Sequence, residues 1–175
     1  MVNAATAVRD VETAWAAASS VPDPEVPVLT VADLGVLRDV RVSDDGSVDV
    51  DITPTYSGCP AMHTIEHDIV ESLRSKGFQD IRVHTTLTPA WTTDWMTDDG
   101  RRKLAEYGIA PPGRRAMGGP VPLTLGVRPA TVDRLTCPQC GSADVRELSH
   151  FGSTACKSLW QCAACHEPFD HFKAI

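Results

Sequence analysis

The sequence has few aromatic residues and few positive charges. Only 6% of its 175 residues are aromatic, and 16 lysines and arginines stand against 23 aspartates and glutamates, for a formal net charge of −7. Residues 132–175 alone hold four lysines and arginines against five acidic residues, so the C-terminal part is not basic either. Nucleic-acid binding requires a basic surface. We therefore expect no nucleic-acid partner.

The N-terminal segment lacks a continuous apolar run, because Arg9, Asp10 and Glu12 interrupt it. This pattern predicts neither a secretion signal nor a membrane-spanning helix. We expect a cytoplasmic protein, in which the cysteines are metal ligands or free thiols rather than disulfides. The chain also lacks paired Glu-x-x-His motifs, the ligand set of a helical di-iron catalyst. We expect no catalytic residues and no enzymatic activity.

Four of the six cysteines form two Cys-x-x-Cys pairs, Cys137 with Cys140 and Cys162 with Cys165. Two such turns can bring four thiolates to the corners of a tetrahedron, which is the geometry of a structural zinc site. Gly141 follows the first pair, where a positive φ is usually needed. Redox-active Cys-x-x-Cys motifs are the less favoured alternative. We predict a zinc ribbon, in which the four ligands fill the site and leave no position for hydrolysis.

Hydrophobic periodicity predicts an α+β domain ahead of the ribbon. Its sheet has three strands, two of them joined by a hairpin turn at residues 44–46. The expected helices cover residues 5–19, with Val8, Val11, Trp15 and Ala18 on one face, residues 60–77, beginning at Pro60 and ending at Gly77, and the second half of residues 91–107; the expected strands cover residues 36–42, 47–53 and 81–87. We expect three parts: the α+β domain at residues 1–108, a Gly/Pro-rich linker at residues 109–131 and the zinc ribbon at residues 132–175.

Cys59 is the most informative cysteine outside the ribbon. Gly58 and Pro60 flank it at the expected start of a helix, where backbone N–H groups and the helix dipole lower the pKa of a thiol. This favours a nucleophile or a metal ligand, although a small buried hydrophobic residue explains the pattern equally well. His63 and His67 share the helical spacing of Cys59, but two solvated histidines are the favoured interpretation of that pair.

Several other residues have two interpretations. Asp23 and Glu25 suit a hard metal ion, but also suit a solvated loop. Trp91 and Trp95 are four residues apart and belong either to the core or to a partner interface. Cys156 is left over once the ribbon is filled, as a packed thiol or a second reactive one.

Longer motifs point to a family. DPEVP at residues 23–27, ADLG at residues 32–35 and TPTYSGCP at residues 53–60 resemble the MIP-type iron-sulfur cluster assembly domain. Together with this domain, the C-terminal part resembles the PaaD family, accessory components of phenylacetyl-CoA epoxidase. The motifs that carry this second resemblance are PAWTTDW (89–95), RRKLAEYGIAPP (101–112), CPQCGS (137–142), FGSTACKSLWQCAAC (151–165) and EPFDHFK (167–173).

The resemblance implies a non-catalytic maturation factor for the oxygenase of aerobic phenylacetate degradation. It implies a transient iron ion or iron-sulfur cluster in addition to structural zinc. By position, Cys59 matches the reactive cysteine of the family, and Asp23, Glu25 and Asp33 match the acidic residues around the same pocket. The resemblance gives His63 no role.

Two functional hypotheses follow. In the first, Cys59 delivers iron or a cluster while the ribbon docks an oxygenase component, either the reductase or the di-iron subunit. In the second, the chain is an interaction subunit that stays bound to the oxygenase and carries only zinc. A thiol enzyme built on Cys59 and His63 is disfavoured, because Glu66 is the one carboxylate at hand to orient the histidine. The sequence leaves open whether a homodimer shares one metal through paired Cys59 thiolates.

Overall fold

The computed structural model describes residues 4–113 and 135–174, with the backbone alone for residues 4–9. The chain divides into two compact units, residues 1–100 and residues 101–175, and each is described by itself. Unit 1 combines helices with a three-stranded sheet, and unit 2 contains a second three-stranded sheet beside the cysteine cluster. The predicted α+β fold class, with a C-terminal ribbon, is confirmed.

The sheet of unit 1 contains β1 (Leu37–Val42), β2 (Val48–Ile52) and β3 (Ile81–Thr85), in the order β1-β2-β3. The hairpin between β1 and β2 turns at Gly46, whose φ of 84° confirms the predicted turn. β3 is parallel to β2, because α2 (Met62–Ser75) returns the chain to the end at which β2 began. Gly77, with a φ of 98°, ends α2 as predicted.

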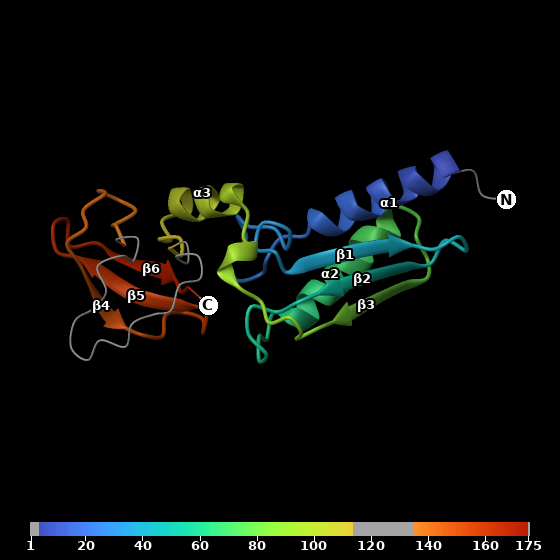
Figure 1. Ribbon diagram of the computed structural model, residues 1–175. Helices are drawn as coiled ribbons and strands as arrows, with labels where there is room; N and C mark the ends of the chain where they lie inside the picture. The colour runs from blue at the N-terminus through green and yellow to red at the C-terminus, as the bar shows by residue number, and fades with distance from the viewer. Residues whose placement is uncertain (1–3, 114–134, 175) are drawn as a thin grey trace, which may run out of the picture. The chain divides into compact units, whose positions relative to one another are not determined.

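One face of this sheet packs on the helices and the other does not. Val48, Val50 and Ile52 of β2 are buried, while Asp49 and Asp51 between them are partly exposed. This alternation shows that the sheet is covered on one side only. Figure 1 shows α1 (Ala4–Ser19) and α2 beside the sheet, and the buried residues Ile65, Ile69 and Leu73 of α2 complete the core.

The buried face of α1 differs from the predicted one. Ala14, Ala17 and Ala18 are buried, whereas Val11 is 37% exposed and Trp15 is 42% exposed. Small residues let α1 approach α2 closely, and the Ser72 hydroxyl donates a hydrogen bond of 2.8 Å to the Ala17 carbonyl. The prediction that Val11 and Trp15 face the core is therefore wrong. The side chain of Val8 lies outside the described residues.

Unit 2 is built around the antiparallel sheet β4-β5-β6, formed by β4 (Val145–Ser149), β5 (Lys157–Cys162) and β6 (Pro168–Phe172). The short helix η1 (Thr93–Trp95) precedes α3 (Asp98–Tyr107), the helix predicted in the second half of residues 91–107. After α3 the chain joins the ribbon: the Ala110 N–H donates to the Asp170 carbonyl at 2.8 Å, and the Phe172 N–H donates to the Ala110 carbonyl at 2.9 Å.

The first residues of the expected linker therefore pack as part of the ribbon, and residues 114–131 lie outside the described residues. The division between the two compact units falls at residue 100, ahead of the expected boundary at 108. Within the described ranges, no helix combines the length and the apolar character needed to cross a membrane.

Candidate metal centres

The sulfur atoms of Cys137, Cys140, Cys162 and Cys165 all lie within 4.8 Å of one another. Cys137 Sγ is 3.7 Å from Cys165 Sγ, and Cys140 Sγ is 3.6 Å from Cys162 Sγ. A tetrahedral zinc ion with Zn–S bonds of about 2.3 Å places its sulfurs about 3.8 Å apart. The four cysteines are free thiols rather than disulfides. The donor set and its spacing therefore fit zinc, which would contribute folding energy and no open coordination position.

Local backbone turns create this geometry. The Gly141 N–H donates to the Cys137 carbonyl at 2.9 Å, and Gly141 has the predicted positive φ, 73°. In the second turn the His166 N–H donates to the Cys162 carbonyl at 3.0 Å, and His166 has a φ of 64°. A non-glycine residue in this region is uncommon. The second turn thus has the same form as the first, with histidine in place of glycine.

The charges of the four thiols oppose one another in the absence of a cation. The backbone N–H of Cys165, with that of Ala164, lowers the pKa of Cys162 to about 7. The Glu167 N–H favours the Cys165 thiolate, but burial and the neighbouring thiols outweigh it and raise the pKa of Cys165 to about 12. Four thiolates therefore need a divalent cation at their centre.

The ribbon core and the zinc ligands are the same residues in part. Cys137 and Cys162 are buried in a cluster with Ala110 and Phe169. Cys156 is also buried, at 5% exposure, with its sulfur 3.0 Å from the Thr154 hydroxyl and outside the four-sulfur group. This supports the interpretation of Cys156 as a packed thiol.

Cys59 lies in the turn between β2 and α2 and is partly buried. Its N–H donates to the Tyr56 carbonyl at 3.2 Å, and its carbonyl accepts from the Met62 N–H at 3.4 Å. The helix begins at Met62 with Ala61 as N-cap, so the predicted start at Pro60 is two residues early. Cys59 therefore stands ahead of the first helical turn, and the effect of the helix dipole on it is weaker than expected because that effect falls off quickly.

Asp23 and Asp33 are buried, at 8% and 7% exposure. Oδ1 of Asp23 accepts from the backbone N–H groups of Glu25 at 2.9 Å and Val26 at 2.7 Å. Oδ2 of Asp33 accepts from the Thr30 N–H at 2.9 Å. Both carboxylates hold the backbone of their own loop, whereas the side chain of Glu25 belongs to a half-buried residue.

Within residues 4–113 and 135–174, the four ribbon cysteines are the one group of three or more Cys, His, Asp or Glu ligands close enough to share a metal. The structure does not gather Cys59 with Asp23, Glu25 and Asp33 into such a set. His63 and His67 are exposed on α2, in agreement with two solvated histidines.

Cys59 nevertheless lies at a crowded end of unit 1. Figure 1 shows the loops at residues 20–36, 53–61 and 86–97 together at the end of the sheet where β2 and β3 finish. Hydrogen bonds join them: the Thr53 N–H donates to the Val36 carbonyl at 2.8 Å, and the Thr86 N–H donates to the Ile52 carbonyl at 2.9 Å. Sequence reasoning grouped these loops only through the resemblance.

The two tryptophans lock this end. Trp91 is buried, and its indole N–H donates to the Leu34 carbonyl at 2.9 Å. The guanidinium of Arg38 lies 3.5 Å from the ring centre of Trp95. Trp91 therefore belongs to the core, and Trp95 holds the loop that follows Asp33. The i, i+4 spacing alone did not separate these roles.

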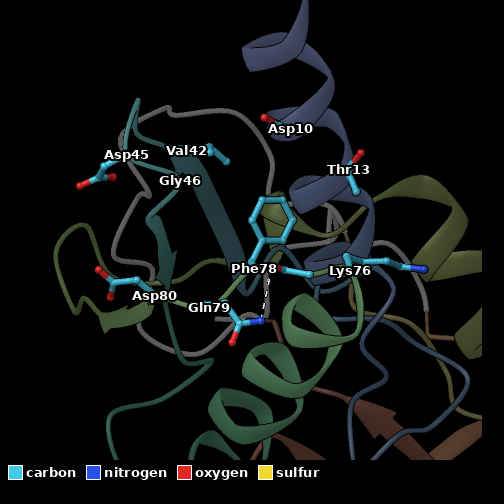
Figure 2. A pocket seen from close by; sticks show the side chains of 10 residues that line it. Asp10, Thr13, Val42, Asp45, Gly46, Lys76, Phe78, Gln79 and Asp80 are labelled. Atoms are coloured by element: carbon cyan, nitrogen blue, oxygen red, sulfur yellow. Dashed lines mark hydrogen bonds between the residues drawn. The ribbon is translucent and has the colours of Figure 1, made fainter. Parts of the chain in front are cut away.

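A pocket of unit 1 lies at the opposite end of the sheet, beside the hairpin turn and the end of α2. Figure 2 shows the ring of Phe78 at its centre, with the side chains of Lys76, Asp45 and Asp80 directed outward. Binding sites for small molecules need polar groups that converge. This pocket therefore supports no ligand.

Comparisons with known proteins agree with this division. Residues 126–173 match the family described as the PaaD zinc beta ribbon domain, and residues 11–85 match the iron-sulfur cluster assembly protein family. An Escherichia coli K12 protein named as a "Putative 1,2-phenylacetyl-CoA epoxidase" component is 46% identical over 161 residues, which are 92% of this chain and 91% of that protein.

Unit 1 has relatives of its own. A protein of Porphyromonas gingivalis named "Fe-S protein maturation auxiliary factor" is 37% identical over 86 residues, which are 49% of this chain and 81% of that protein. The crystal structure of a domain of unknown function, DUF59, from Bacillus anthracis matches with a TM-score of 0.54 and 24% identity, over 58% of this chain and 97% of that one. This last likeness shows the fold alone.

Proposed function

Because the chain belongs to the PaaD family, we propose that it serves phenylacetyl-CoA epoxidase as an accessory maturation factor and has no catalytic activity of its own. The supporting observation is the joining of two parts in one chain. One part matches the iron-sulfur cluster assembly family and carries Cys59, and the other is a ribbon whose four thiols form a closed site.

Cys59 would hold iron or an iron-sulfur cluster as cargo. A stable cluster normally has four protein ligands, and the described residues offer no such set around Cys59. A thiolate with few protein ligands suits transfer better than storage. Asp23 and Asp33 would support this site by shaping its loops through their backbone hydrogen bonds, and Glu25 is the acidic residue of the set whose carboxylate would face the cargo.

The ribbon would carry structural zinc and dock the oxygenase component, either the reductase or the di-iron subunit. A second candidate function, that of a stably bound subunit carrying only zinc, is favoured by the name of the E. coli relative. The two candidates differ in one respect. A maturation factor is needed to make the epoxidase active, whereas a structural subunit is needed while it runs.

The first test is epoxidase activity in cells that carry Cys59→Ser, with protein levels checked. We expect loss of activity at a normal protein level, since serine keeps the size of the side chain but binds iron poorly. Cys156→Ser is the matched control, because that thiol is packed in unit 2, and it should retain activity. Full activity of Cys59→Ser would refute a role for Cys59 in delivery.

The second test mixes purified, fully metallated epoxidase components with and without this protein. Equal turnover in both mixtures is expected of a maturation factor. A stoichiometric requirement for the protein would instead establish the interaction subunit.

A further inference from the structure

Thr53 carries the one buried side-chain oxygen or nitrogen, within the part of the chain that the structure describes, that has no hydrogen-bond partner. The residue is 1% exposed. A buried hydroxyl without a partner destabilises a fold, and a valine of the same shape would avoid this cost. Such a group in a native protein requires an explanation.

The position of Thr53 is as informative as its burial. It directly follows β2 and opens the turn that carries Cys59. In sequence it continues the series Asp49 and Asp51, which point to the uncovered face of the sheet, but unlike them it is buried. The segments that meet at this end of the sheet therefore cover the hydroxyl, and its backbone N–H is held by the Val36 carbonyl at 2.8 Å.

We infer that the Thr53 hydroxyl is kept for the iron-loaded state, in which it donates a hydrogen bond to the thiolate of Cys59. The inference rests on the proposed function, because it requires Cys59 to carry iron. A thiolate bound to metal accepts hydrogen bonds, and donors around it strengthen metal binding and orient the ligand. Thr53 is thus a positioning residue that acts through Cys59.

The geometry of the turn permits this contact. Cys59 and Thr53 belong to the same loop, and α2 begins only at Met62, so the thiol is not held in a helix. Rearrangement within the loop is enough to bring the two groups together. The hydroxyl would then find its partner only when the thiol is ionised by a metal.

The test compares Thr53→Val, which removes the hydroxyl, with Thr53→Ser, which keeps it. Thr30→Val is the matched control, because the Thr30 hydroxyl accepts a hydrogen bond from the Asp33 N–H at 3.1 Å. Without iron, Thr53→Val should unfold at the same urea concentration as the wild type or a higher one, and Thr30→Val at a lower one. Zinc-filled protein is used throughout, so that the ribbon does not take up iron.

Anaerobic titration with Fe(II) then reports the loaded state, together with the rate at which a thiol reagent modifies Cys59. We expect Thr53→Val to bind Fe(II) about tenfold more weakly, as for a lost hydrogen bond to a charged group, and to protect Cys59 less. Thr53→Ser should restore both. Wild-type iron binding by Thr53→Val, or destabilisation of its iron-free form as large as that of Thr30→Val, would overturn the inference.

Cys59→Ser in the same titration separates the two ideas. If it loses iron binding while Thr53→Val does not, only the role of Thr53 fails. If Cys59→Ser binds Fe(II) as the wild type does, the proposed function fails and the inference falls with it.

Discussion

The two thiol sites of this protein are built in opposite ways. In the ribbon, backbone turns place four sulfurs within 4.8 Å of one another, so the metal site is already formed. In unit 1, a single thiol stands in a turn ahead of α2, and the nearby acidic residues Asp23 and Asp33 bind backbone N–H groups. The closed site suits permanent zinc, and the open one suits a cargo that leaves.

The comparison also concerns what holds each site in shape. The ribbon cysteines are part of a small core, and their mutual repulsion is relieved only by a cation. The Cys59 turn is held by neighbouring loops through backbone hydrogen bonds and two tryptophans. Loss of metal should therefore unfold the ribbon and leave unit 1 intact.

The largest effect is expected from Cys137→Ser. In a module this small, binding free energy of zinc is folding free energy, so unit 2 should lose several kcal/mol of stability. Zinc analysis should give less than one ion per chain, and hydrogen exchange should show loss of protection in residues 135–174.

Cys59→Ser is the control for this change. It should keep one zinc ion per chain and alter the free energy of unfolding by about 1 kcal/mol or less. A native protein purified without zinc, yet with a protected ribbon, would contradict the distinction between the two sites.

The second largest effect is expected from Gly35→Ala in the loop next to Asp33. Gly35 has a φ of 69°, and a Cβ there would lie 2.5 Å from the Trp95 carbonyl oxygen. We expect a loss of about 2 to 4 kcal/mol, since backbone strain and a clash with backbone add together. Urea unfolding of unit 1, with zinc content unchanged, measures it.

Gly46→Ala supplies the comparison, because Gly46 has a φ of 84° but nothing within 4 Å of the added Cβ. Its cost should be about 1 kcal/mol, from the positive φ alone. Equal costs for the two variants would mean that Trp95 does not hold the loop at the Cys59 end.

A smaller effect concerns His171 in the ribbon, whose pKa is lowered by burial. In the unfolded chain a histidine has a pKa of about 6.5, so as the pH falls the unfolded state takes up this proton first. The stability of the ribbon should therefore decline as the pH drops from about 6.5 towards the lower folded pKa. NMR titration of the His171 ring, with zinc in excess, should give a midpoint below 6.5; a midpoint at or above this value would refute the prediction.

The smallest effect is a gain. His166→Gly should stabilise the ribbon by about 0.5 to 1 kcal/mol, because glycine adopts a positive φ without the steric cost of a side chain. Gly141→His, at the matching position of the first turn, should destabilise it by a similar amount. Thermal unfolding of the zinc-loaded variants measures both, and a loss of stability in His166→Gly would show that the imidazole itself makes a needed contact.

The sequence by itself determined the features that depend on short spacing. The four zinc ligands come from two Cys-x-x-Cys turns, and the turn at Gly46 and the end of α2 at Gly77 follow from glycine's access to positive φ. Each of these involves a few consecutive residues, so their geometry does not depend on the rest of the chain.

The tertiary structure alone decided which groups are buried and what they meet. Periodicity placed Trp15 in the core, but close packing of α1 against α2 buries alanines instead. The turn before α2, the carboxylates of Asp23 and Asp33 and the unpartnered hydroxyl of Thr53 all depend on loops that are distant in the chain and meet at one end of the sheet. Long-range packing chooses among side chains that local patterns treat as equivalent, which is why Cys59 could be named from the sequence while its surroundings could not.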